Sequence, residues 1–115
     1  MPWWTQPAAM PDGGDWNGRY HSEQYGDLEV TVKGGFARGV LQATGSKLEL
    51  GGSVEGDLWR YGWTELNRTT NEIRHGRGYF RYRVRQGTHE LKGEWGLGDN
   101  EAGNIWEALK LTRER

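Results

Sequence analysis

The sequence predicts an all-β fold: a single antiparallel, up-and-down meander of about eight strands that closes into a small β-barrel. From residue 15 onward, apolar side chains recur at every second position, which is the period of a half-buried strand. Short turns, most of them containing glycine, separate these segments and can join only antiparallel neighbours. A barrel of about eight strands is either filled by side chains or holds one small ligand, and closure removes exposed sheet edges.

The composition agrees with one folded domain and excludes several kinds of site. The chain has 115 residues, a net charge of -1 and no cysteine, which excludes a disulfide scaffold, a thiol nucleophile and cysteine-based metal sites. Seven Trp, five Tyr and two Phe supply core volume that the few aliphatic residues do not. The sequence shows no signal-peptide pattern and no apolar run long enough to span a bilayer. We therefore expect a cytoplasmic protein, held at a membrane only through a partner if at all.

Residues 1–14 form a proline-rich arm ahead of the barrel, which we place at residues 15–113. Three prolines near the start of the arm forbid a regular helix or a central strand. Trp3 and Trp4 are adjacent, and paired indoles are unfavourable in water. The arm is therefore either a frayed terminus or a segment that docks these indoles on the barrel, on another protein or at a membrane interface.

Four strands are expected directly after the arm, at residues 15–22, 26–32, 37–43 and 48–54. Their inward positions are Trp16, Gly18, Tyr20 and Ser22; Leu28, Val30 and Val32; Ala37, Gly39, Leu41 and Ala43; and Leu48, Leu50, Gly52 and Val54. The turns between them contain glycine, which supplies the positive φ that tight hairpins need. Alternation therefore predicts that these four strands follow one another through hairpins.

Four more strands are expected at residues 59–63, 78–85, 89–97 and 105–113. The inward positions of the first three are Trp59, Tyr61 and Trp63; Gly78, Phe80, Tyr82 and Val84; and His89, Leu91, Gly93, Trp95 and Leu97. The last strand is ambiguous because apolar residues lie on both of its faces: Trp106 and Ala108 on one, and Ile105, Leu109 and Leu111 on the other. A short terminal helix therefore remains an alternative there. Residues 66–77 are rich in Asn, Thr and Arg and are expected to form the longest loop.

Glycine lies between two inward apolar residues in several of the expected strands. The unit apolar-x-Gly-x-apolar occurs around Gly18, Gly39, Gly52 and Gly93. Because glycine weakens a strand, its repeated use needs a packing reason. In a small, strongly curved barrel, the missing Cβ lets the strand coil and leaves room for a facing Trp or Tyr. We therefore expect Gly39, Gly52 and Gly93 to lie inward beneath aromatic rings.

The order of these motifs resembles that of known barrels. The motifs are Trp16-x-Gly18-x-Tyr20, Tyr25-Gly26-x-Leu28, Leu50-x-Gly52-x-Val54, Gly76-x-Gly78-x-Phe80 and Leu91-x-Gly93-x-Trp95, together with Gly39, Trp63 and Trp106. The series is similar to that of small, uncharacterised bacterial Gly/Trp-rich meander β-barrel proteins. It is also avidin-like and calycin-like, and that resemblance implies an antiparallel barrel with a small ligand inside. Avidin's first strand reads Trp-x-Asn-x-x-Gly-Ser, whereas Tyr20-His21 stands here in place of the Gly-Ser, so biotin binding is not carried over.

No group of residues in the sequence predicts catalysis, a metal or a cofactor. His21, His75 and His89 do not lie at metal-ligand spacing, and most Asp and Glu alternate outward onto a solvated face. The serines lack the context of a nucleophile elbow, and no phosphate-binding loop is present. We therefore expect a protein that is not an enzyme and that binds no metal and no cofactor.

Nucleic-acid binding is not favoured either. Residues 77–82 partly resemble the aromatic strand on which RNA-recognition motifs stack bases. That module also needs two helices behind its sheet, and the pattern of this chain supplies none. The basic residues of 81–85 are instead expected to face the charged residues of 90–94 on the next strand.

Two functions remain open, and both are forms of binding. In the first, the chain is a non-enzymatic interaction module, an accessory or structural subunit that docks on a larger assembly. Its expected contacts with a protein partner come from the arm and the 66–77 loop: Trp3, Trp4, Arg68, Arg74 and Arg77. In the second, the chain is a small-ligand-binding barrel whose interior holds a small aromatic or amphipathic ligand. The expected lining is Trp59, Tyr61, Trp63, Phe80, Tyr82 and Trp95.

The free volume inside the barrel discriminates between these two functions. A pocket of about 300 Å³ or more favours the ligand, and a filled core favours the interaction module. An enzyme is the least favoured function, and a homo-oligomer remains open.

Overall fold

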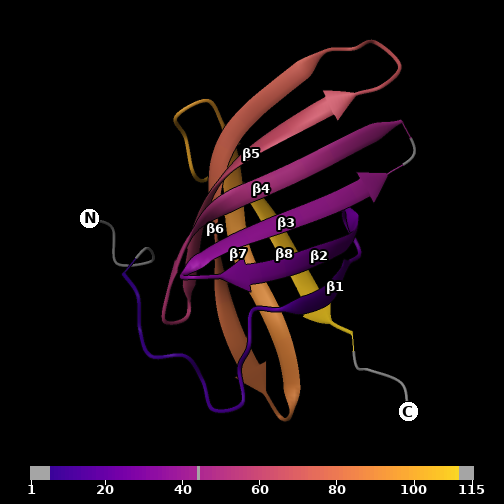
Figure 1. Cartoon of the computed structure of the whole chain (residues 1–115). Coiled ribbons are helices and arrows are strands. Elements are labelled where there is room, and N and C mark those ends of the chain that lie inside the picture. The colour runs from indigo at the N-terminus through magenta and orange to yellow at the C-terminus, as the bar shows by residue number, and fades with distance from the viewer. Residues whose placement is uncertain (1–5, 44, 112–115) are drawn as a thin grey trace.

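The computed structural model describes residues 6–43 and 45–111, which form one closed barrel of eight antiparallel strands (Figure 1). The strands are β1 (Gly18–Ser22), β2 (Gly26–Lys33), β3 (Phe36–Ala43), β4 (Ser46–Glu55), β5 (Leu58–Asn67), β6 (Ile73–Arg85), β7 (Thr88–Leu97) and β8 (Asn104–Lys110). Each strand pairs with the next in sequence, and β1 pairs with β8 to close the barrel. The predicted all-β meander barrel is confirmed. Among the described residues there is no helix, and so none that is long and apolar enough to cross a membrane.

Alternation along the strands determines which side chains fill the barrel. The buried core consists of Trp16, Tyr20, Leu28, Val30, Ala37, Leu41, Leu50, Trp59, Tyr61, Trp63, Phe80, Tyr82, Leu91, Trp106 and Ala108. In β1 to β7 these residues stand at positions that the sequence predicts to be inward. In β8 the ambiguity is resolved, because Trp106 and Ala108 are buried whereas Ile105 and Leu109 are exposed. The segment is a strand, so the alternative of a terminal helix is wrong.

Two inward glycines make room for aromatic rings. A Cβ at Gly39 would lie 3.0 Å from Trp59 Cη2, so this glycine lies beneath a ring, as expected. Gly78 in β6 is directly opposite Tyr61 in β5, and a Cβ there would lie 2.5 Å from the tyrosine hydroxyl oxygen. The rings thus pack flat against the sheet where the side chain opposite is missing.

Gly52 and Gly93 have a different role from the one expected. A Cβ at Gly52 would lie 1.8 Å from the Arg60 carbonyl oxygen, and one at Gly93 would lie 1.8 Å from the Tyr79 carbonyl oxygen. The nearest obstacle at these two positions is therefore backbone and not a ring, although Gly93 is the cross-strand partner of both Phe80 and Trp106. The strongly coiled sheet instead brings the backbone of the neighbouring strand so close that no side chain fits.

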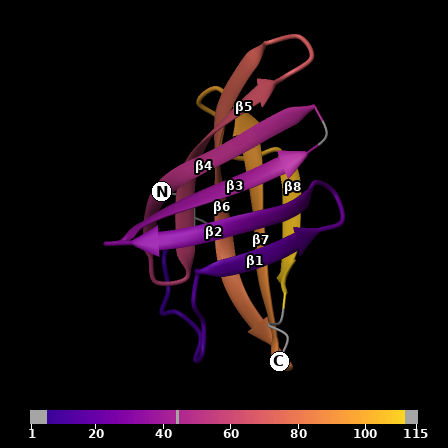
Figure 2. The same ribbon diagram turned by 45° about the vertical axis from the view of Figure 1, so that its right-hand side comes forward.

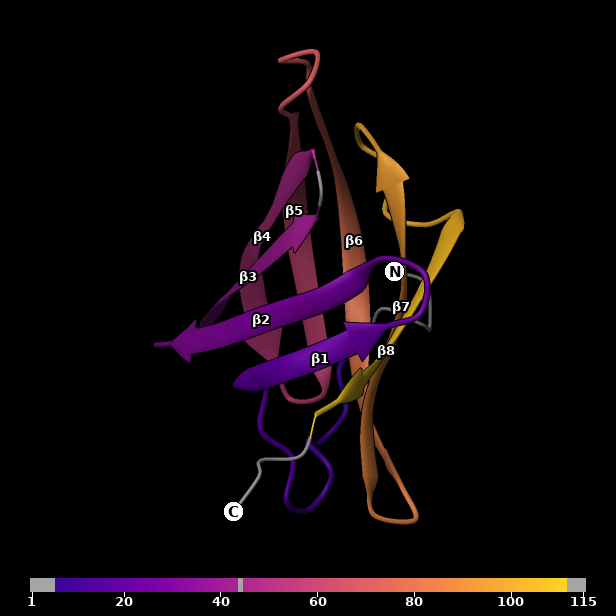
Figure 3. The same cartoon turned by 90° about the vertical axis from the view of Figure 1, so that its right-hand side faces the viewer.

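Residues 66–77 form the tip of a long hairpin, and the prediction of a loop over this whole range is wrong. β5 continues to Asn67 and β6 begins at Ile73, so only residues 68–72 turn. Asn67 Oδ1 accepts hydrogen bonds from two backbone N–H groups of the turn, at 2.9 and 3.1 Å. The hairpin extends beyond the rest of the barrel at the top of Figures 1 and 3.

One end of the barrel is covered by the segment that precedes β1. We call the end with the turns after β2, β4 and β6 the closed end, because residues 6–17 run across it (indigo in Figures 2 and 3). Trp16 Nε1 donates to the Gly56 carbonyl oxygen at 3.2 Å, and its ring packs edge-on against Trp59 and Tyr82. The opposite end, with the turns after β1, β3, β5 and β7, is called the open end.

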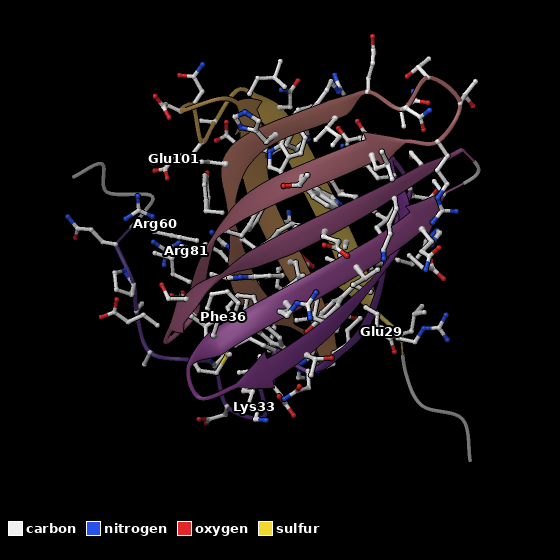
Figure 4. All side chains as sticks on the ribbon, turned by 45° about the horizontal axis from the view of Figure 1, so that its top comes forward. Glu29, Lys33, Phe36, Arg60, Arg81 and Glu101 are labelled. Atoms are coloured by element: carbon white, nitrogen blue, oxygen red, sulfur yellow. The ribbon has the colours of Figure 1, made fainter. Side chains whose placement is uncertain are left out.

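The described part of the arm is attached to the barrel by hydrogen bonds. Ala8 N donates to Asp57 Oδ1 at 2.8 Å, and Asp57 N donates back to the Ala8 carbonyl oxygen at 2.9 Å. Arg81, which Figure 4 shows beside this segment, donates to the Gln6 carbonyl oxygen and also to Asp57 Oδ1. Met10 packs against the core. This part of the arm therefore belongs to the folded domain.

Candidate functional site

The open end of the barrel contains a pocket with a volume of about 90 Å³. We call it the mouth pocket, and its lining residues are Tyr25, Leu48, Trp63, Glu65, Arg74, Trp95 and Trp106. They come from β4, β5, β6, β7, β8 and the turn between β1 and β2. Residues far apart in the sequence therefore meet here only because the sheet closes.

The aromatic rings of the mouth pocket stand at steep angles to one another. Trp63 and Trp95 have ring centroids 5.4 Å apart at 87°. Tyr25 lies 6.3 Å from Trp95 at 73° and 5.2 Å from Trp106 at 72°. Edge-to-face contacts of this kind are favourable because the edge of one ring is positive and the face of the other is negative. These rings therefore pack edge-to-face and do not stack in parallel.

Hydrogen bonds fix two of these indoles. Trp63 Nε1 donates to the Gly96 carbonyl oxygen at 3.0 Å, and Trp95 Nε1 donates to the Tyr25 hydroxyl at 3.1 Å. Trp63 also lies opposite Gly76, where a Cβ would be 2.7 Å from the indole ring. The pocket walls are therefore held in place before any ligand arrives.

The rim of the mouth pocket carries one ion pair. Glu65 and Arg74 are cross-strand partners in β5 and β6. Arg74 donates to Glu65 Oε1 from Nε at 3.1 Å and from Nη2 at 2.8 Å. The Arg74 side chain is 56% exposed and that of Glu65 is 27% exposed, so the pair lies at the edge of the pocket in contact with water.

Four of the six residues expected to line a ligand cavity lie deeper, in the filled interior. Trp59, Tyr61, Phe80 and Tyr82 are all buried, and the first three have ring centroids within 5.9 Å of one another. Only Trp63 and Trp95 reach the mouth pocket. The interior is therefore occupied by side chains, and the remaining cavity is well below the roughly 300 Å³ of an ordinary small-molecule site.

Three buried polar atoms in the core have no hydrogen-bond partner among the described residues. They are Trp59 Nε1, Tyr61 Oη and Trp106 Nε1. Burial raises the pKa of Tyr61 well above its ordinary value, because the phenolate loses its hydration. The phenol therefore stays protonated and neutral at neutral pH.

The three arginines expected to bind a partner each have a partner within the chain. Arg74 lies on the rim of the pocket, whereas Arg68 lies in the hairpin turn and donates to Gln42 Oε1 at 3.3 Å. Arg77 has its Nη2 atom 3.9 Å from Asp99 Oδ1. Trp3 and Trp4 lie outside the described residues.

Sequence reasoning missed Tyr25, Leu48, Glu65 and Trp106 as residues of the site. Tyr25 lies in a turn, where alternation gives no inward or outward direction. Trp106 lies in β8, whose pattern is ambiguous in sequence but whose register places Trp106 opposite Gly93. A glycine stands across from Trp63 and from Trp106, as it does from Tyr61 and Phe80, so this signal marks inward aromatic residues but not the end of the barrel at which they lie.

Exposed apolar side chains gather around the open end. Of the eight large apolar residues that are exposed in the described chain, five lie there: Tyr25, Leu66, Ile73, Leu97 and Ile105. Leu66 and Ile73 are cross-strand partners on the β5–β6 hairpin. Single exposed apolar residues are normal, so what distinguishes this end is that five of them lie around it.

A polar cluster lies at the closed end, beneath the arm. Tyr82 Oη and His89 Nδ1 are 2.6 Å apart, and Lys110 Nζ lies 3.4 Å from the same Tyr82 oxygen. Tyr20 donates to the Trp16 carbonyl oxygen at 2.7 Å, and burial raises the pKa of Tyr20 far above its ordinary value. The described residues contain no group of three His, Asp or Glu that could hold a metal ion.

No protein-family model, curated protein or solved structure matches this chain. The site is therefore interpreted from its own geometry.

Proposed function

We propose that this chain is a non-enzymatic interaction module, an accessory or structural subunit that docks on a protein partner through the open end of its barrel. The observation that supports this most directly is the filled interior: side chains occupy the barrel, and the pocket at its mouth has a volume of about 90 Å³. A barrel of this kind has no room to enclose a ligand of ordinary size. Binding must then take place on the outside.

The exposed apolar residues support the open end as the docking surface. Ile73 is 65% exposed, Ile105 60% and Leu97 50%, and all three lie around the mouth pocket. Burial of each such side chain against a partner contributes roughly 1.5–3 kcal/mol. The projecting β5–β6 hairpin carries Leu66 and Ile73 out to where a partner can contact them (Figure 3).

Of the two regions expected to contact a protein partner, the arm and the 66–77 loop, the arm is the less favoured. Its described residues contact Asp57 and Arg81 at the closed end, whereas the 68–72 turn lies at the open end. A single partner would have to span the barrel to contact both. We therefore place the main contact at the open end.

Site-specific photo-crosslinking tests the proposal. A photoreactive phenylalanine analogue replaces Ile73 at the open end, and in a matched variant it replaces Leu109, which is 52% exposed near the other end of β8. In cells that express the chain naturally, we expect one defined product from position 73 and none from position 109. Excess unlabelled protein should compete for that product, and a Leu66→Asp variant should compete poorly.

Two other outcomes of the crosslinking experiment would each lead to a different conclusion. A product of twice the chain's own mass would identify a second copy as the partner. Equal products from both positions, or none from position 73, would show that the open end is not the docking surface.

A further inference from the structure

The mouth pocket has the size of a compact chemical group and not of a whole ligand. Its volume of about 90 Å³ holds about three water molecules at roughly 30 Å³ each, and it is smaller than the roughly 150 Å³ of a cavity that takes up benzene. The pocket opens to solvent at the end of the barrel, so the rest of a bound molecule remains outside. The occupant is therefore a small head group on a longer molecule.

The walls of the pocket favour a cation. Four aromatic side chains line it: Tyr25, Trp63, Trp95 and Trp106. Three pairs of these rings have interplanar angles of 72–87°. The face of an aromatic ring carries negative potential, and a cation within about 6 Å of the ring centre is attracted to it. Several aromatic rings around one small opening are also what an aromatic cage for a quaternary ammonium group needs.

The charges on the rim agree with this preference. Both hydrogen bonds from Arg74 go to Glu65 Oε1, while Glu65 Oε2 accepts no hydrogen bond from any described residue. The charge of Arg74 is offset by Glu65 and screened by water, since more than half of its side chain is exposed. An approaching cation therefore meets a carboxylate oxygen, whereas an anion meets that oxygen and the negative faces of the rings.

From this geometry we propose that the mouth pocket binds a quaternary ammonium group, N-methylated and compact. Its methyl groups pack against Trp63, Trp95 and Trp106, while the positive charge interacts with the ring faces and with Glu65. The group either belongs to a small molecule such as choline or ends a methylated lysine side chain of a partner. This inference rests on the mouth pocket, whereas the docking proposal rests on the exposed apolar residues, and each has its own experiment.

A titration with a charged ligand and its neutral isostere tests the proposal. Choline is compared with 3,3-dimethylbutan-1-ol, which has the same shape without the charge, by following the indole N–H signals in NMR spectra. We expect choline to shift the signals of Trp63, Trp95 and Trp106 and to leave that of Trp16, at the closed end, unchanged. The neutral alcohol should bind about tenfold more weakly, because it lacks the cation–π attraction. Equal binding of both compounds, or no shift with choline, would overturn the proposal.

Three variants test the roles of individual residues, with Phe36→Leu as a control. Glu65→Gln should weaken choline binding several-fold and Arg74→Gln should strengthen it, whereas the opposite signs would indicate an anionic ligand and contradict the proposal. Trp95→Leu should abolish binding. Phe36 is an exposed aromatic residue on β3 near the closed end (Figure 4), so Phe36→Leu should leave choline binding unchanged. If Trp95→Leu fails to fold, the two rim variants decide the question, because their side chains are not part of the core.

Trimethyllysine identifies the source of the group. Choline and a short peptide containing trimethyllysine are titrated under the same conditions. Tighter binding of the peptide, with additional shifts around Ile73 or Leu97, would indicate a side chain of a partner. Tighter or equal binding of choline would indicate a free small molecule.

Discussion

At the scale of single residues, one carbonyl oxygen explains why position 93 is glycine. A Cβ there would lie 1.8 Å from the Tyr79 carbonyl oxygen, which is far inside van der Waals contact. The obstacle is the backbone of the neighbouring strand, which cannot rotate away as a side chain can. Gly62 shows the contrast, because it is exposed and a Cβ there would lie 3.8 Å from the nearest atom, the Gly76 carbonyl oxygen.

We therefore predict that Gly93→Ala destabilises the barrel by at least about 2 kcal/mol, since the strands must separate to admit the methyl group. Gly62→Ala should change the free energy of unfolding by no more than about 0.5 kcal/mol. Thermal unfolding of the two variants, followed by near-ultraviolet circular dichroism, compares them directly. Equal melting temperatures would contradict the close approach of the two strands at position 93.

His21 should titrate above its ordinary range. Its Nδ1 atom lies 2.7 Å from Asp27 Oδ1, and this hydrogen bond is the main cause that raises the pKa of His21 above 6.5, with a smaller contribution from Glu23. The folded pKa exceeds the unfolded one, so the interaction stabilises the fold fully below pH 6.5. That stabilisation is lost as the pH rises through the folded pKa. The effect on stability is small because both side chains are partly exposed.

NMR titration of the His21 ring protons measures this shift. Asp27→Asn should return the pKa towards 6.5, and Glu23→Gln should lower it less. A pKa that does not change in Asp27→Asn would mean that the hydrogen bond does not form in solution.

At the scale of strands, alternation predicts well which side chains point into the barrel, but it predicts poorly where a strand begins and ends. The strands are buried mainly on one side, so their period of two reports most inward positions. Leu58, Tyr79 and Glu90 are exceptions, because each is buried beside an inward residue. Near the tip of the β5–β6 hairpin both faces are largely exposed, and the polar segment 66–77 then looks like a loop although residues 66–67 and 73–77 are strand. The mouth pocket was only partly predictable for a related reason. Trp63 and Trp95 follow from alternation, whereas Tyr25 and Trp106 reach them through closure and register, which periodicity does not contain.

The hairpin turn makes its own prediction at this scale. Asn67 Oδ1 accepts two backbone hydrogen bonds, and Asn71 adopts a positive φ of 64°. Asn67→Ala should cost about 1 kcal/mol, because it removes both hydrogen bonds from an exposed turn. Asn71→Gly should be neutral or slightly stabilising, since glycine adopts this φ without strain. Urea unfolding measures both variants, and a larger loss for Asn71→Gly would contradict the turn geometry.

At the scale of the whole molecule, the barrel has two unlike ends. The closed end is covered by a segment that packs Met10 against the core and exchanges hydrogen bonds with Asp57. The open end keeps a pocket and a group of exposed apolar residues. The two ends thus differ in how the chain covers them.

Deletion of residues 1–11 should therefore lower the stability of the isolated barrel. The loss of the Ala8–Asp57 hydrogen bonds, the Gln6–Arg81 contact and the packing of Met10 amounts to about 2–3 kcal/mol. For a domain of this size, that corresponds to a decrease of about 10 °C in melting temperature. Choline binding at the open end should survive in the fraction that remains folded. An unchanged melting temperature would show that the arm is not part of the folded domain in solution.

The seam between β1 and β8 has a consequence for how the chain folds. Two paired positions, Tyr20 with Lys110 and His21 with Leu109, join these strands, and Leu111 N adds a bond to the Arg19 carbonyl oxygen at 2.8 Å. The six hairpins that connect β2 to β8 need only local chain closure, but this seam must bring together residues about 90 positions apart, at a larger cost in entropy. The seam is therefore the last part of the barrel to form and the first to open. Hydrogen exchange at the His21, Leu109 and Leu111 amides, which face the partner strand across the seam, should be faster than in the middle of β6. A circular permutant that joins residues 1 and 115 and starts within the 68–72 turn should fold more slowly than the original chain, because it makes the nine paired positions of β5 and β6 long-range in place of the two of the seam.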